Sequence, residues 1–137
     1  MALVIPTSAE VIILGMILNK VKQDDLMLRL YSNDKKPDKS DSHNDYTEAD
    51  GFGYAAIRLQ PGRWKIDPGI PDDETPTEAN YSKCVFEFTG ELGRVYGYFV
   101  TREVSGQLMW AERFGDGPYN TMNNGGKIEV QLSLQGN

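Results

Sequence analysis

The stretch Leu26-Met-Leu-Arg-Leu-Tyr31 decides the class of fold of this 137-residue chain. Its three leucines alternate with Met27, Arg29 and Tyr31, and a period of two residues is typical of a β-strand with one buried face. The segment therefore predicts a strand whose leucines enter a core.

The chain on the C-terminal side of this strand repeats the same kind of segment. Further strands are predicted over residues 53–60, 64–66, 81–89, 94–102, 107–114 and 127–135, each bounded by turn residues. Strands of this length and spacing are typical of an antiparallel sandwich or barrel. The length suits one core, and no repeat or dividing linker is visible, so we expect a single all-β domain over residues 1–137.

Two of these segments, 95–101 and 108–114, predict a hairpin through Ser105-Gly106. Both carry apolar side chains on both faces, as expected of strands that are covered on both sides. Gly97 would let another backbone or an aromatic ring approach closely. The side chains expected in the core are Leu28, Leu30, Phe86, Phe88, Tyr96, Tyr98, Val100 and Trp110.

Two long polar stretches interrupt the strands. Residues 32–50 are rich in Ser, Asn, Asp, Lys and Pro, and loops of this length are usually functional or mobile. Residues 67–80 contain three prolines, which exclude a central strand there. We expect both stretches to be exposed, and the first to be a candidate contact surface.

Residues 1–22 are predicted to form an N-terminal arm and a short helix. Thr7 as N-cap with Glu10 three residues later matches a capping box, and Asn19-Lys20 suits a helix end. The apolar run Val11–Leu18 is far shorter than the roughly twenty residues of a membrane span. No Lys or Arg precedes it, so we expect neither an export signal nor a membrane partner.

This helix carries apolar side chains on nearly every face. It is therefore either enclosed inside the domain or partly covered by another subunit. Under the second interpretation the arm and helix take part in contacts between subunits or with a larger shell. The candidate protein-contact residues are Val11, Ile12, Ile13, Met16 and Ile17.

Charge and motifs exclude several classes of function. The 14 basic side chains are scattered among 20 acidic ones, so no stripe is present to bind nucleic acid. Cys84 lies in a strand segment and His43, the only histidine, in a polar loop, which does not suggest a nucleophile with its base. The acidic runs 38–45 and 72–74 lack the spacing of a calcium loop. We expect no enzyme activity, no cofactor and no metal.

Two weaker signals concern sugars. Three carboxylates lie in or beside predicted strands, where a facing pair could hydrolyse glycosides: Glu87, Glu103 and Glu112. We expect Glu112 instead to pair with Arg113 at a sheet margin. Trp64 and Trp110 are candidate glycan-contact residues, although rings of this kind ordinarily fill the cores of β-sandwiches.

Many weak motifs occur in a characteristic order. They are Met1–Pro6 before a short apolar helix, then Leu28–Asn33, Tyr46–Glu48, Gly53–Ala56, Trp64, Phe86–Gly90, Val95–Thr101 and Trp110–Phe114. In this order and spacing the chain resembles small virion structural proteins of tailed bacteriophages, almost from end to end. It departs from them in the loop at residues 67–80, which is longer and more acidic.

The resemblance implies a capsid decoration, or cement, protein: an antiparallel jelly-roll-like β-sandwich with one short N-terminal helix. Such a protein is non-enzymatic, is made in the host bacterial cytoplasm and lies on the capsid exterior. Its implied partners are itself, as a trimer or dimer, and the major capsid protein or another virion protein. The alternative is a tail-fibre or baseplate component that binds a receptor or glycan.

Overall fold

The computed structural model describes residues 3–120 and 126–136. These residues form one α-helix, three short 3-10 helices and eleven strands, so the fold is mostly β, as predicted. The helices are α1 (Thr7–Ile17), η1 (His43–Asp45), η2 (Pro61–Arg63) and η3 (Pro71–Asp73). The strands are β1 (Leu26–Tyr31), β2 (Ile57–Leu59), β3 (Trp64–Asp67), β4 (Glu78–Tyr81), β5 (Cys84–Glu87), β6 (Arg94–Val95), β7 (Gly97–Arg102), β8 (Leu108–Arg113), β9 (Tyr119–Asn120), β10 (Lys127–Val130) and β11 (Ser133–Gln135).

The largest sheet has the order β2-β1-β7-β8 and is antiparallel throughout. β1 has the predicted bounds and lies between β2 and β7, with Leu28 opposite Val100 and Leu30 opposite Tyr98. β7 and β8 form the predicted hairpin, with a register shift between Val100 and Thr101. The strand that is clearest in the sequence is therefore a central strand of the main sheet.

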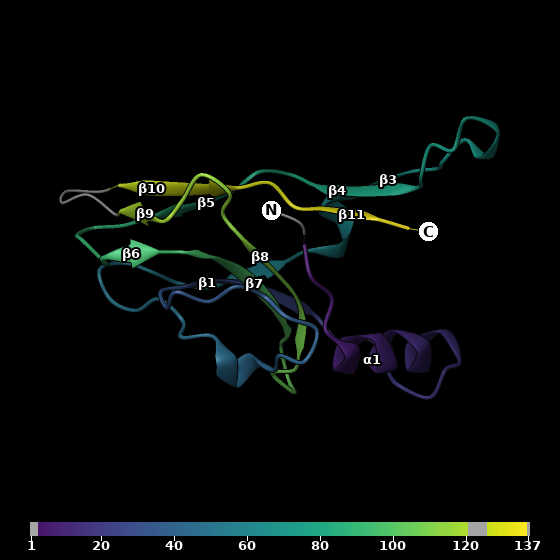
Figure 1. Ribbon diagram of the computed structural model, residues 1–137, viewed down its shortest axis with the longest axis horizontal. Coiled ribbons are helices and arrows are strands. Elements are labelled where there is room, and N and C mark those ends of the chain that lie inside the picture. Colours follow the sequence, from purple (N-terminus) through teal and green to yellow (C-terminus); the bar gives the residue numbers. More distant parts are fainter. Residues whose placement is uncertain (1–2, 121–125, 137) are drawn as a thin grey trace.

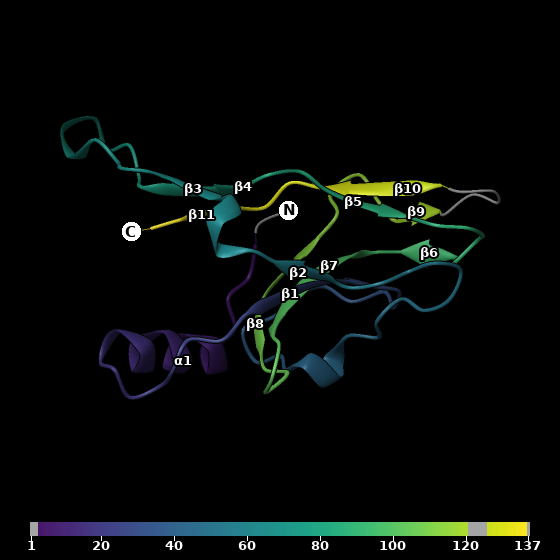
Figure 2. The same ribbon diagram turned by 180° about the vertical axis from the view of Figure 1, so that it is seen from behind.

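Smaller antiparallel sheets form the opposite layer. They are β10-β5 and β11-β4-β3, while β6 pairs with β9 at one end. Figures 1 and 2 show these strands lying across from the main sheet. The predicted strand 81–89 is divided, because Tyr81 pairs with Trp64 in one sheet and Cys84–Glu87 pair with β10 in another. The predicted strand 53–60 is also shorter, since only Ile57–Leu59 pair with β1.

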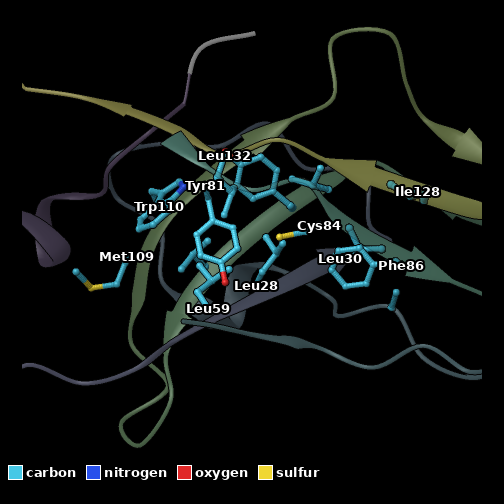
Figure 3. Packing of buried hydrophobic residues seen from close by; sticks show 14 of the residues in the cluster. Leu28, Leu30, Leu59, Tyr81, Cys84, Phe86, Met109, Trp110, Ile128 and Leu132 are labelled. Atoms are coloured by element: carbon cyan, nitrogen blue, oxygen red, sulfur yellow. The ribbon is translucent and has the colours of Figure 1, made fainter. Parts of the chain in front are cut away.

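The core lies between the two layers. Leu28, Leu30 and Trp110 from the main sheet pack towards side chains of the opposite layer such as Phe86 and Ile128 (Figure 3). The core prediction is confirmed at seven of the eight positions, since only Tyr96 is half-buried. Cys84 is a buried strand cysteine, as expected, and burial raises the pKa of its thiol.

The outer face of the main sheet carries a second, aromatic cluster. Tyr31 is fully buried there together with Tyr46, Phe99, Leu108 and Ala111. The Tyr46 ring stacks on Phe99 at 5.2 Å between centroids and meets the edge of Tyr31 at 4.9 Å. Residues 32–50 lie over this face: Asp41, Tyr46 and Ala49 are buried, while most of the other side chains are exposed, as expected.

A buried carboxylate holds this covering segment, residues 32–50, in its folded conformation. Asp41 is 6% exposed and accepts hydrogen bonds from the Tyr46 hydroxyl at 2.7 Å and the Asp38 backbone N–H at 2.8 Å. The Lys35 ammonium lies 2.8 Å from its other oxygen. Because each oxygen of the buried charge has a partner, a polar sequence folds back as a well-packed layer.

Gly97 is the close-approach position that the sequence predicts. A Cβ atom at Gly97 would lie only 2.6 Å from the Tyr31 ring and would also meet the Glu112 carbonyl oxygen. The absence of a side chain therefore leaves room for the Tyr31 ring beside β7. The buried position of Tyr31 depends on this glycine.

Helix α1 begins differently from the prediction. Pro6 is the N-cap residue, no side chain caps the helix, and Thr7 is the first helical residue, so the expected capping box is absent. Proline suits this position because its missing N–H has no intrahelical partner there. The helix ends at Ile17 with Leu18 as C-cap, and Asn19, the residue expected near its end, follows with φ 60°. In the described part of the chain no helix is both long and apolar enough to cross a bilayer.

Candidate functional site

The outer face of α1 carries an exposed apolar stripe. Ala9 and Ile12 point into the core, at 0% and 6% exposure. Away from this buried side, four apolar residues are 60–73% exposed: Val11, Leu14 and Ile17 of the helix and Leu18 at its C-cap. Solvent-facing positions of a helix are normally polar, so this stripe, which we call the α1 stripe, is the strongest candidate contact surface.

The five predicted contact residues divide between two roles. Val11 and Ile17 lie on the α1 stripe, whereas Ile12 is buried and therefore cannot contact a partner. Ile13 and Met16 are partly buried against the core. The prediction was thus wrong for Ile12, because composition alone does not show which side of an apolar helix meets the sheet.

Leu14 and Leu18 belong to the surface but were not among the predicted contacts. Their spacing from Val11 places them on one side of the helix. This signal is present in the sequence, but it becomes interpretable only when the buried side is known.

A second exposed apolar region lies on the arm formed by β3, β4 and residues 68–77 between them. Ile66 is 67% exposed and Ile70 is 53% exposed. This agrees with the prediction that the proline-rich stretch is exposed. Figures 1 and 2 both show the tip of this arm and α1 at the same end of the molecule.

The two tryptophans do not form a sugar platform. Trp110 is 5% exposed and Trp64 is partly buried. Their ring centroids are 6.4 Å apart in an edge-to-face arrangement, and Trp64 also meets Tyr81 edge-on at 5.0 Å. Both rings therefore pack in or against the core, which leaves Trp110 with no face for a glycan.

The three carboxylates singled out from the sequence have separate surroundings. Glu112 accepts a hydrogen bond from the Tyr98 hydroxyl at 2.9 Å, and Arg113 pairs with Asp34 at 2.6 Å. The predicted Glu112–Arg113 ion pair was therefore wrong, because neighbouring residues on a strand point to opposite faces. Glu103 pairs with Arg58, and Glu87 is exposed on β5.

A polar pocket of about 280 Å³ opens on the outer face of the main sheet, at the border of the covering segment. Arg29 on β1 lies in its wall, and its Nη1 donates to both Glu48 oxygens at 3.0 and 3.1 Å. Its Nε donates to the Thr101 hydroxyl at 3.0 Å. His43 lies on the rim, far in the fold from the buried Cys84, and no sequence pattern had indicated this site.

Metal chemistry finds no support in the described part of the chain. Residues 3–120 and 126–136 contain no group of three or more His, Cys, Asp or Glu side chains placed to hold a metal ion. The acidic run 38–45 uses its carboxylates within the loop: Asp38 accepts from Ser40, and Asp45 accepts from the Ser42 backbone N–H.

The chain was compared with protein-family models, curated proteins and solved structures. No family model, curated protein or solved structure matches the chain at a significant level.

Proposed function

We propose that this chain is a non-enzymatic structural protein of a tailed bacteriophage particle, of the capsid decoration type. It binds the capsid exterior, self-associates as a trimer or dimer, and stabilises the shell through protein–protein contacts with the major capsid protein or another virion protein. The observation that carries the proposal is the α1 stripe, which leaves Val11, Leu14, Ile17 and Leu18 exposed beside a packed core. The phage assignment itself rests on the sequence resemblance.

The mode of contact follows from the geometry of one end of the molecule. α1 and the arm that carries Ile66 and Ile70 lie at that end, so one neighbour or two adjacent neighbours can meet both. When a neighbour covers an apolar stripe, each Å² of apolar surface removed from water contributes about 25 cal/mol to the free energy of association. Such contacts are weak individually, but many copies on a symmetric lattice add together.

The proposal includes a jelly-roll-like strand order. Two features support it: the layers are antiparallel throughout, and β1 is paired with β7, a strand distant in the sequence. Strand pairings of this kind occur when the chain crosses repeatedly between layers.

The test replaces Leu14 and Leu18 by Gln, a good helix former that removes the apolar surface without altering the core. We expect the variant to fold normally and to bind shells that lack the protein at least tenfold more weakly, measured by co-sedimentation. The matched control is Val104→Gln, since Val104 is 87% exposed at the β7–β8 turn. It should bind shells like the unaltered protein.

Deleting residues 1–20 would be a less specific test of the surface. Val4 forms a β-bridge with Ala111, and Ala9 and Ile12 belong to the core, so the deletion would also damage the fold. Point substitutions on the α1 stripe separate binding from folding. Unchanged shell binding by the Leu14→Gln/Leu18→Gln variant would contradict the proposed surface.

Cryo-electron microscopy of the intact particle tests the location. Density for this fold on the capsid exterior, with α1 against a neighbour, is the expected result. Density in a tail fibre or baseplate would instead establish the alternative function. If the particle contained no density for this protein, a virion role would be refuted.

A further inference from the structure

The pocket beside Arg29 has the features of a small binding site unrelated to the α1 stripe. It lies on the outer face of the main sheet and is lined by β1, β7, the covering segment and Gly106 of the β7–β8 turn. Its volume of about 280 Å³ is at the lower limit of ligand sites in proteins, and suits one ring rather than a peptide. We propose that this pocket binds a neutral pyranose ring with vicinal hydroxyl groups.

The polar wall of the pocket is held rigidly. Arg29 donates to Glu48 through Nη1 and to Thr101 through Nε. The Tyr54 hydroxyl donates to Glu48 at 2.6 Å and itself accepts the Leu30 backbone N–H at 3.1 Å. Because two further side chains orient the ion pair, a ligand loses little affinity to ordering the wall.

The rim supplies groups that have no other role. Among the described residues, neither the His43 imidazole nor the Asn44 carboxamide has a hydrogen-bond partner, and both residues are exposed. They stand on η1, a short helix whose conformation is held by the reciprocal bonds between Ser42 and Asp45. Two unused polar side chains are therefore presented at a fixed place beside the Arg29–Glu48 pair.

The charge and the polar groups of the pocket indicate the class of ligand. Arg29 and Glu48 neutralise each other at 3.0 Å, so the wall favours neither a free anion nor a free cation. Planar carboxylate, guanidinium and carboxamide groups bind adjacent hydroxyls in pairs, because they offer two parallel hydrogen-bonding positions. Tyr46 and Phe99 also line the pocket, but their rings are only 6% and 3% exposed, so the polar groups make the contacts with the ligand.

The test is a titration of the isotope-labelled protein with glucose, galactose and N-acetylglucosamine, followed by backbone amide NMR. For a site of this size we expect dissociation constants of about 1–10 mM for at least one sugar. The shifted amides should be confined to the surroundings of Arg29, His43–Glu48, Phe99–Thr101 and Gly106.

The variant His43→Ala/Asn44→Ala should weaken sugar binding at least fivefold without changing the melting temperature, because neither side chain bonds to another described residue. Lys36→Ala, an exposed position in the same covering segment but outside the pocket, is the control and should bind normally. The proposal is overturned if no sugar shifts these amides at tens of millimolar, if sugars shift amides elsewhere, or if acetate or phosphate binds there and sugars do not. These outcomes leave shell binding through the α1 stripe unaffected.

Discussion

At the scale of single residues, one glycine decides how the outer face of the main sheet packs. Gly97 faces the Tyr31 ring, and a methyl group there would overlap the ring and the Glu112 carbonyl oxygen. We predict that Gly97→Ala lowers the free energy of unfolding by about 1–3 kcal/mol, since overpacking displaces neighbouring atoms. Urea denaturation measures the change.

The control for this prediction is Gly62→Ala. A Cβ atom at Gly62 meets nothing within 4 Å, and its φ is not positive. This substitution should leave stability unchanged or raise it by about 0.4–1 kcal/mol, because alanine restricts the unfolded chain. Equal effects of the two substitutions would show that Tyr31 does not pack on β7 as described.

At the scale of elements, Asp41 holds residues 32–50 together through partners that lie within the same segment. Replacing it with Ala leaves the Tyr46 hydroxyl and the Lys35 ammonium without their partner. We expect this substitution to lower the free energy of unfolding by about 1–3 kcal/mol, measured by urea denaturation. The second measurement is amide hydrogen exchange, which should accelerate in residues 32–50 more than in β5 and β10.

Tyr46→Phe separates the hydrogen bond from the stacking. It keeps the ring on Phe99 and removes only the donor to Asp41, so its effect should be smaller than that of Asp41→Ala. Uniform acceleration of exchange over the whole chain in Asp41→Ala would mean that this carboxylate stabilises the fold globally rather than the covering segment.

Helix α1 offers a second test at this scale, because its two sides have opposite roles. Ile12 is 6% exposed, whereas Leu14 is 60% exposed. Ile12→Ala should lower the free energy of unfolding by about 2–5 kcal/mol, and Leu14→Ala by no more than about 0.5 kcal/mol. Thermal or chemical denaturation measures both changes. Comparable losses at both positions would show that the helix is covered on both sides within the monomer.

At the scale of the whole molecule, buried tyrosines couple stability to high pH. Burial, the largest cause in each case, raises the pKa values of Tyr31, Tyr46, Tyr54 and Tyr98 above 10. Carboxylates beside Tyr46, Tyr54 and Tyr98 raise them further. The folded state therefore retains these protons more strongly than the unfolded chain does.

The sign of the effect follows from this difference in proton binding. The stabilisation is fully present below the ordinary tyrosine pKa of 10 and is lost as the pH rises through the folded-state values. We predict cooperative unfolding above about pH 10, with loss of circular dichroism accompanying the tyrosinate absorbance of these buried side chains. Complete tyrosine ionisation with unchanged circular dichroism would contradict it.

The sequence by itself determined the parts of this protein that depend on local pattern. Alternation in Leu26–Tyr31 located a central strand with its bounds, and the segments around Ser105-Gly106 located the hairpin. Periodicity works there because side chains on a strand alternate between faces whatever the partners are. A glycine inside a predicted strand likewise identified Gly97 as a position of close approach, because it has no side chain.

Only the tertiary structure decided features that depend on pairing across long distances in the chain. The burial of Tyr46 within residues 32–50 depends on its stacking on Phe99, and the pocket wall forms because Arg29 reaches both Glu48 and Thr101. The buried side of α1 was likewise chosen by contact with the sheet, since an apolar helix has no polar side to mark its orientation. Contacts of this kind join residues that share no local pattern, so no stretch of sequence contains the information to predict them alone.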